Sequence, residues 1–265
     1  MSIKKMMAPA ICATVMALAI AACANQSMQS GGAKPLSVTD YAAVLADPAR
    51  PAADKADDAA RKPAEVLAFA QIRPGDTVLE MEAGRGWYSD LLSTAIGPTG
   101  KLIIQYPPEF AYGDAALKAR TDAGRLKNAV ITVTAFDALQ APDQSVDKVL
   151  WILGPHEIYY TPRNAKAGAL GDPQKTYAAI ARVLKPGGVF IAMDHAAEAG
   201  APTTTGQTIH RVDPAVVMAA AKAAGLVYMD KSDVLANPAD DRSKMVFDAS
   251  IRRHTDQFLF RFKKP

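Results

Sequence analysis

The sequence predicts one three-layer α/β domain built around a mostly parallel β-sheet. Short apolar runs, typical of strands buried on both faces, alternate with segments of helical periodicity from residue 77 onward. A glycine-containing turn joins the first of these strands to the next helix, and a second strand follows within about 30 residues, the usual length of a right-handed parallel crossover. The chain has 265 residues, and once an N-terminal targeting segment is set aside, the remainder has the length of a single domain.

The first half of the domain is expected to open with helix and then to begin the sheet. Residues 38 to about 69 have a helical pattern, with Pro63 where a first helical turn tolerates proline. After the turn RPGD, the predicted elements are a strand TVLEME (77–82), a helix WYSDLLSTAIG (87–97) and a strand KLIIQY (101–106). A helix over 114–126 and a strand AVITVTAF (129–136) continue the alternation.

The second half repeats this alternation around a long loop. SVDKVLWIL (145–153) is a strand, and the loop over 154–173 has a length that usually indicates a functional segment. A helix, a tight turn at Gly187-Gly188 and a strand are expected over 173–195, and Asp213-Pro214 begins a helix that Gly225 ends. LVYMDKSDV (226–234) and QFLFRFKK (257–264) are the last two strands.

The N-terminus has the pattern of an export signal. Two lysines precede an apolar run over residues 6–22 that is marginal in length for a membrane-spanning helix. IAAC at residues 20–23 resembles a bacterial lipobox, so we expect cleavage before Cys23 and acylation of that cysteine. The expected organisation is a signal peptide over 1–22, a flexible tether over 23–36 and a folded domain over 37–265. The alternative is an ordinary signal peptide with a stray cysteine near its end.

The predicted anchor and the composition define the expected surroundings of the domain. The only other cysteine, Cys12, lies inside the removed segment, so no disulfide is expected in the mature monomer. Ala24 and Asn25 provide no aspartate of the kind that retains lipoproteins at the inner membrane, so we expect the lipid in the outer membrane and the domain facing the periplasm. The net charge of +3 is small, with Lys and Arg interspersed among Asp and Glu, which argues against a nucleic-acid partner.

Acidic residues and glycines directly follow the first predicted strand. Ligands of parallel sheets bind beyond the carboxyl ends of the strands, so Glu80, Glu82, Gly84 and Gly86 are candidates for a binding site. Glycines let a ligand approach the backbone, and the N-terminus of the following helix offers free N–H groups. A strand-to-helix turn also needs glycine for steric reasons alone, so the glycine pair by itself leaves both interpretations open.

Two longer motifs make a family resemblance specific. VLEMEAGRGWYSDLL resembles the first motif of class I S-adenosylmethionine (SAM)-dependent methyltransferases, and VLKPGGVFIAMDH resembles their strand-five motif. RKPAEVLAF, HEIYY, NPADDRSKMVFD and TDQFLFRF are similar to an exported, predicted methyltransferase branch of that family. The resemblance implies SAM as cofactor and a Rossmann-like three-layer class I methyltransferase fold, with a seven-stranded sheet in the order 3-2-1-4-5-7-6 and one antiparallel strand.

The resemblance assigns cofactor-binding roles residue by residue. The residues that it places around SAM are Glu80 at the end of the first strand, Ala83, Gly84 and Gly86 beside the methionine moiety, Gln105 and Tyr106 near the ribose, and Asp137 at the adenine amino group. Two positions depart from the family pattern. Glu82 replaces a usual glycine, and Gln105 stands where an acidic residue usually holds the ribose hydroxyls, so it loses the strength of a charge-assisted hydrogen bond. Asp137 is alternatively a solvated turn residue.

The resemblance places the methyl acceptor after the fourth strand, beside His156 and Glu157. A histidine there could take a proton from a nucleophile, while Tyr159 and Tyr160 could form a wall of the pocket, so His156 and Tyr159 are the candidate catalytic residues. An ordinary surface histidine is the alternative. Asp194-His195 ends the fifth strand, where a structural role and a place at the same pocket are both open. No spacing of His, Cys and Asp suggests a metal site, and no GxSxG or Walker motif is present.

Three hypotheses of function follow. The first is a SAM-dependent methyltransferase that acts on an unidentified small or lipid-like acceptor, and it requires an open shelf from Ala83 toward Asp137 for the adenosyl group. The second is a lipoprotein of the same fold that binds a small molecule or a partner without catalysis, since Glu82, Gln105 and a location remote from cytoplasmic SAM all weaken the first. The third, a dinucleotide oxidoreductase, is disfavoured because GxGxxG is absent.

Overall fold

Seven strands form one sheet in the order β3-β2-β1-β4-β5-β7-β6, which confirms the predicted topology. The computed structural model describes Met1 and residues 34–265, and the predictions for Cys23, the signal peptide and most of the tether lie outside the described residues. β1 to β5 pair in parallel, whereas β7 pairs antiparallel with both β5 and β6. The strands are β1 (Thr77–Met81), β2 (Lys101–Tyr106), β3 (Ala129–Val133), β4 (Val146–Ile152), β5 (Leu184–His195), β6 (Val227–Ser232) and β7 (Gln257–Lys263).

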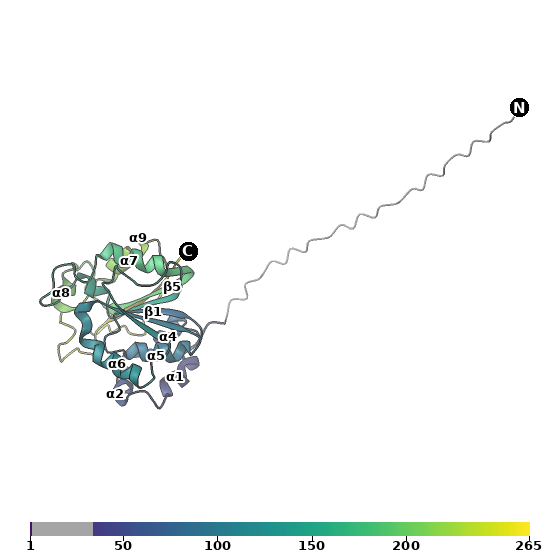
Figure 1. Ribbon diagram of the computed structural model, residues 1–265. Helices are drawn as coiled ribbons and strands as arrows, with labels where there is room; N and C mark the ends of the chain where they lie inside the picture. Colours follow the sequence, from purple (N-terminus) through teal and green to yellow (C-terminus); the bar gives the residue numbers. More distant parts are fainter. Residues whose placement is uncertain (2–33) are drawn as a thin grey trace. The chain divides into compact units, whose positions relative to one another are not determined.

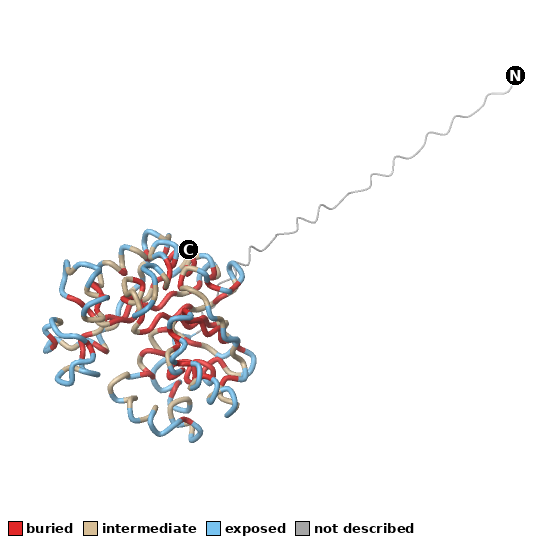
Figure 2. Tube along the Cα trace, turned by 60° about the vertical axis from the view of Figure 1, so that its left-hand side comes forward, coloured by how far each residue is buried: buried red, intermediate tan, exposed pale blue. Residues whose placement is uncertain are grey.

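Helices cover both faces of this sheet and complete the three layers. Helices α4 (Pro63–Ala70), α5 (Trp87–Ile96) and α6 (Asp114–Asp122) lie on one side, and α7 (Pro173–Val183) and α9 (Pro214–Ala223) lie on the other (Figure 1). The caps follow the sequence expectations, because the Asp172 side chain accepts from Lys175 N–H and the Asp213 side chain accepts from Ala215 N–H. Buried residues concentrate along the strands between these layers (Figure 2).

The helical pattern over residues 38–69 forms several short elements, and the helix start expected at Pro63 is confirmed by α4. The segment contains a 3-10 helix η1 (Val38–Tyr41) and four short α-helices, α1 (Ala42–Ala46), α2 (Ala52–Lys55), α3 (Asp58–Arg61) and α4. Prolines cause two of the breaks, since Pro51 precedes α2 and Pro63 begins α4. Lys62, between α3 and α4, takes a left-handed conformation with a φ of 44°. Within the part of the chain that the structure covers, no helix combines the length and apolarity needed to cross a bilayer.

Three short helical segments occupy connections at the carboxyl ends of the strands. The 3-10 helix η2 (Pro108–Gly113) follows β2 directly, and the 3-10 helix η3 (Pro155–Tyr159) follows β4 within the long loop. Helix α8 (Thr205–Ile209) lies between β5 and α9 in the sequence and packs against η3. Since β1, β4 and β5 are neighbours in the sheet, their ends and these three segments meet at one edge of the fold.

Candidate active site

The turn after β1 is built on left-handed backbone. Glu82 has a φ of 61°, Gly84 of 54° and Gly86 of 77°, and Glu82 N–H donates to the Gln105 carbonyl at 2.7 Å. A side chain in this region costs roughly 1–2 kcal/mol, which explains why glycine is usual at the position of Glu82. The Glu82 carboxylate is therefore held at the first turn of the sheet by a strained backbone conformation.

The Glu82 side chain points toward the end of β4. Its Oε2 lies 3.4 Å from Trp151 Nε1, and a Cβ on Gly154 would lie 2.3 Å from the same oxygen. Burial, followed by repulsion from Glu157, raises the pKa of the Glu82 carboxyl well above its usual value near 4.5. Glycine at position 154 is thus a steric requirement of this carboxylate.

A pocket of about 340 Å³ lies between the β1 turn, η3 and α8. Its walls combine carboxylates, histidines and the backbone of the glycine turn with apolar and aromatic side chains. The residues around it include Glu80, Glu82, Ala83, Gly84, Tyr88, Tyr112, Ile152, Leu153, His156, Glu157, His195, His210, Val246 and Phe247.

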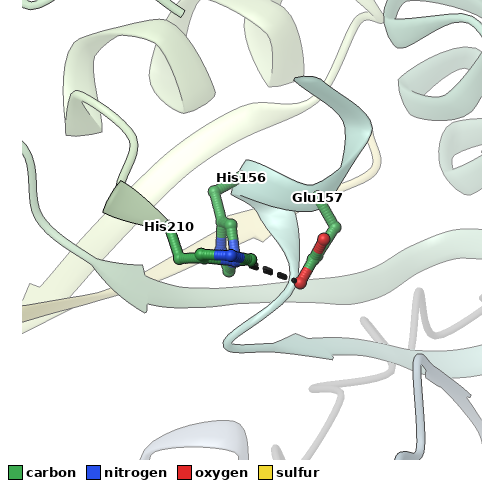
Figure 3. Close-up of side chains that lie close together, drawn as sticks. All are labelled: His156, Glu157 and His210. Carbon is green, nitrogen blue, oxygen red and sulfur yellow. Dashed lines mark hydrogen bonds and ion pairs between the residues drawn. The ribbon is translucent and has the colours of Figure 1, made fainter. Parts of the chain in front are cut away.

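η3 turns His156 and Glu157 into this pocket, where His210 from the end of α8 meets them (Figure 3). Asp194 fixes His156 from behind, because it accepts from His156 N–H at 2.6 Å and lies 2.9 Å from His156 Nδ1. The opposite ring nitrogen, His156 Nε2, lies 3.2 Å from Glu157 Oε1 and 3.2 Å from His210 Nδ1. Asp194 is fully buried, so the imidazole has one orientation.

The charges of this cluster are strongly coupled. Burial alone would lower the pKa of His156, but the Asp194 and Glu157 carboxylates outweigh it and raise the pKa well above 6.5. Burial would raise the pKa of Glu157, yet hydrogen bonds with His156 and His210 lower it to about 2. Burial and the positive charge on His156 lower the pKa of His195 well below 6.5. With nothing else in the pocket, His156 is therefore protonated near neutral pH, which works against the predicted role of proton acceptor.

The structure divides the predicted cofactor residues between the pocket and its surroundings. Glu80, Ala83 and Gly84 line the pocket. Gly86 does not line the pocket. A Cβ at this position would lie 2.7 Å from Leu117 Cδ2, so the need for glycine there is structural. Glu80 is 3% exposed and accepts from Ser89 Oγ at 2.5 Å, and burial raises the pKa of Glu80 to about 7.

The residues expected near the ribose and adenine are engaged within the protein. The Gln105 amide donates to the Thr134 carbonyl, while its Oε1 is buried and has no hydrogen-bond partner among residues 34–265. The Tyr106 hydroxyl lies 2.6 Å from Asp114 Oδ1, and Asp137 accepts from Asp172 N–H at 3.0 Å. None of these three predicted residues lines the 340 Å³ pocket.

The pocket at the β1 turn does not include Asp137, the far end of the expected shelf, and η2 lies against this turn. A Cβ on Gly113 would lie 1.9 Å from the Gly84 carbonyl oxygen, so the two backbones are in close contact. Phe110, also from η2, packs its ring 6.2 Å from that of Phe136, and both side chains are buried.

The side chains of Tyr159 and Tyr160 lie in different surroundings. Tyr159 lines a different surface pocket, together with Asp172 and Ala220, and not the one that contains His156. Tyr160 packs its ring 5.0 Å from that of His210, which places it behind the histidine cluster. The predicted catalytic Tyr159 therefore does not line the pocket that contains His156 and Glu157.

His210 is the site residue that the sequence did not reveal. It lies 54 residues after His156 and precedes Arg211 in a segment without a recognisable motif. One signal was available: the chain has only four histidines, and three of them, His156, His195 and His210, line one pocket.

Sequence comparisons connect the chain with methyltransferases. No protein-family model matches it. The chain is 28% identical over 128 residues to a ubiquinone/menaquinone biosynthesis C-methyltransferase of Hydrogenovibrio crunogenus, covering 48% of this chain and 45% of that protein. It is 28% identical over 122 residues to an arsenite methyltransferase of Halobacterium salinarum, covering 46% of this chain and 27% of that protein. The matched region spans less than half the length of these curated relatives.

Solved structures share the fold over most of the chain. A SAM-dependent methyltransferase from Aquifex aeolicus matches with a TM-score of 0.56 and 21% identity, covering 80% of this chain and 96% of that chain. A geranyl diphosphate C-methyltransferase from Streptomyces coelicolor, solved with Mg²⁺, geranyl diphosphate and S-adenosyl-L-homocysteine, matches with a TM-score of 0.56 and 14% identity, covering 84% and 89%. The [4+2]-cyclase SpnF matches with a TM-score of 0.55 and 18% identity, covering 81% of each chain.

These likenesses define the fold. The chain has the Rossmann-like class I methyltransferase fold, and the curated proteins that match part of its sequence are methyltransferases. A cyclase among the structures shows that this fold by itself does not determine the reaction.

Proposed function

We propose that this chain is a SAM-dependent methyltransferase that acts outside the cytoplasm, held at a bacterial membrane by a lipid on Cys23. One observation carries the enzymatic part. A single pocket joins the glycine turn after β1, where the family holds the methionine end of SAM, to His156 and Glu157 after β4, where the family places the methyl acceptor. The methyltransferase relatives support this assignment.

The residues fit SAM at one end and require a movement at the other. Glu80, Ala83 and Gly84 would surround the methionine moiety, since they line the pocket. The buried and unpartnered Gln105 Oε1 is an acceptor available for a ribose hydroxyl. η2 would have to withdraw from Gly84 to admit the adenosyl group. When bound, SAM supplies a methyl group on a positively charged sulfur.

The pocket suits an acceptor that is largely apolar and carries one polar group. Ile152, Leu153 and Val246 line it together with the ionised Glu157, whose carboxylate could hold a hydroxyl of the acceptor. Phe247 also lines the pocket and is 59% exposed, and Met245 close by is 42% exposed. Exposed apolar side chains beside the pocket favour a lipid-like molecule that enters from a membrane surface. A relative named for quinone biosynthesis is consistent with such an acceptor.

Titration calorimetry of the purified full chain with SAM tests the cofactor assignment. We expect one SAM bound per chain and weaker binding in Gly84→Ala, because a Cβ there points toward Tyr112 Oη at 3.8 Å beside the methionine end. Gly225→Ala is the control, since Gly225 also has a positive φ, of 82°, but has no described atom within 4 Å of its Cβ position. No heat at millimolar SAM, or equal loss in both variants, would contradict the proposal.

Transfer of a labelled methyl group from SAM to a membrane extract tests the reaction itself. We expect the wild-type protein to label a component that partitions with lipids. Glu157→Gln should abolish this labelling while it leaves SAM binding intact, because Glu157 lies on the acceptor side of the pocket. Labelling that persists in Glu157→Gln would remove that residue from the acceptor site.

The anchor is tested by metabolic labelling with a fatty acid in bacterial cells. Wild-type protein should incorporate the label and sediment with membranes, and Cys23→Ser should lose the label and enter the periplasmic fraction. Cys12→Ser is the control, because Cys12 lies in the segment removed by cleavage. Cys23→Ser protein that still carries the label would overturn the assignment of this cysteine.

A second candidate function is a binding protein of the same fold without methyl transfer. Glu82 at the glycine position and the absence of Gln105 and Asp137 from the pocket favour it. The two candidates differ in the labelling experiment. SAM binding without transfer to any membrane or soluble extract, from a protein that is folded and correctly anchored, would favour the binding protein.

A further inference from the structure

Three potential metal-ligand atoms lie close together in the pocket, one each from His156, Glu157 and His210. His156 Nε2 is 3.2 Å from Glu157 Oε1 and 3.2 Å from His210 Nδ1, and His210 Nδ1 is 3.7 Å from Glu157 Oε1. Figure 3 shows the two imidazoles and the carboxylate turned toward one another. A proton on His156 Nε2 holds these atoms together when no metal ion is bound, and a divalent cation could replace that proton at the same point.

The triangle has the size that a metal ion would impose. Tetrahedral coordination with bonds of 2.0–2.1 Å to nitrogen and oxygen gives a separation of about 3.3 Å between ligand atoms. The three observed separations, 3.2, 3.2 and 3.7 Å, are close to that value. Small side-chain adjustments would therefore complete the coordination.

The second shell of a histidine ligand is already in place. Asp194 lies 2.9 Å from His156 Nδ1, so the hydrogen on Nδ1 points to this carboxylate, and loss of the Nε2 proton on metal binding would free the Nε2 lone pair for a metal ion. A carboxylate behind a histidine is the arrangement that fixes ligand orientation and raises ligand basicity in metal sites. Asp194 and His156 are both buried, so the pair has no solvent to replace this contact.

One carboxylate oxygen of the cluster is unpaired. Glu157 Oε2 is buried and has no hydrogen-bond partner among the described residues, although the other oxygen of the same carboxylate contacts both histidines. Glu82 adds a second carboxyl to the same pocket, and Asp194 adds a third behind His156. A divalent cation would satisfy the free Glu157 oxygen.

We propose that His156, Glu157 and His210 bind one divalent transition-metal ion, of which zinc is the representative, with at least one coordination position open to the pocket. Two histidines and one carboxylate are a ligand set that suits zinc or iron. The open position would take an oxygen of the acceptor, either a hydroxyl or a phenol, and hold it opposite the glycine turn. The site does not depend on SAM binding.

Metal binding by the full chain tests this proposal directly. Protein stripped with a chelator should bind one Zn²⁺ per chain in titration calorimetry, and Co²⁺ should give the visible absorption of a low-coordinate nitrogen and oxygen site. Asp194→Asn should weaken Zn²⁺ binding by about 10–100-fold while keeping the three ligands. His210→Ala should abolish the cobalt spectrum.

His254→Ala is the matched control, because His254 is the remaining histidine of the chain and is exposed. Circular dichroism of His210→Ala shows whether the variant folds, and a folded variant without metal supports the site. Absence of Zn²⁺ binding by wild-type protein, or wild-type affinity in folded His210→Ala, would overturn the proposal and leave a shared proton between His156 and Glu157 as the cation. Both readouts are made without SAM, so they are separate from a failure of methyl transfer.

Discussion

Glu80 should make the stability of the domain fall as the pH rises, and Glu80→Gln should remove this fall. The carboxyl is 3% exposed at the end of β1, and its hydrogen-bond donor is Ser89 Oγ. Burial raises the pKa of Glu80 from 4.5 to about 7, against the hydrogen bond from Ser89, which lowers it. The folded state therefore holds this proton at pH values where the unfolded chain has released it.

The sign and size follow from the two pKa values. Between about pH 4.5 and 7 the folded state binds more protons than the unfolded state, so the free energy of unfolding decreases as the pH rises. The loss is about 0.8 kcal/mol at pH 5 and about 3.4 kcal/mol at pH 8. Glutamine does not titrate, so the stability of Glu80→Gln relative to wild type should increase by about 2.5 kcal/mol between these two pH values.

Urea unfolding of wild type and Glu80→Gln at pH 5 and pH 8 measures this difference. Other titrating groups are common to both proteins and cancel in the comparison. With a slope of about 2.5 kcal/mol per molar urea, the relative midpoint should move by about 1 M. Glu109→Gln, which removes an exposed carboxyl, is the control and should show no such shift. Equal differences at the two pH values would refute the argument that burial keeps Glu80 protonated.

Three further substitutions test the packing around the pocket. Glu82→Gly should raise the free energy of unfolding by about 1 kcal/mol in urea at pH 8, because it relieves the left-handed φ of 61° and removes a buried carboxyl; a destabilised variant would show that the carboxylate is held by favourable contacts. Gly154→Ala should lower the free energy of unfolding by about 1–3 kcal/mol, since its Cβ would lie 2.1 Å from Trp151 Nε1, and unchanged stability would contradict this close packing. Arg211→Ala should lower it by about 3–5 kcal/mol, because it leaves the buried Asp240 without its partner at 2.8 Å, and a thermal melt within error of wild type would disprove that loss.

The order of strands and helices was largely readable from the sequence. Apolar strands, capping aspartates and glycine turns are local signals, so the sheet topology and the bounds of most elements could be predicted from short segments. The sequence did not show where the helical segment over residues 38–69 is divided. Its composition is helical throughout, but the prolines and the left-handed Lys62 divide it into short pieces.

The sequence by itself determined the fold and which turn of the sheet lines the pocket, because VLEMEAGRG combines a buried strand with the glycines of a strand-to-helix turn. Tertiary structure decided what surrounds that turn. η2 closes over Gly84, and α8 carries His210 to His156 across 54 residues. Neither contact has a local pattern, since each depends on two segments that meet only when the whole sheet has formed.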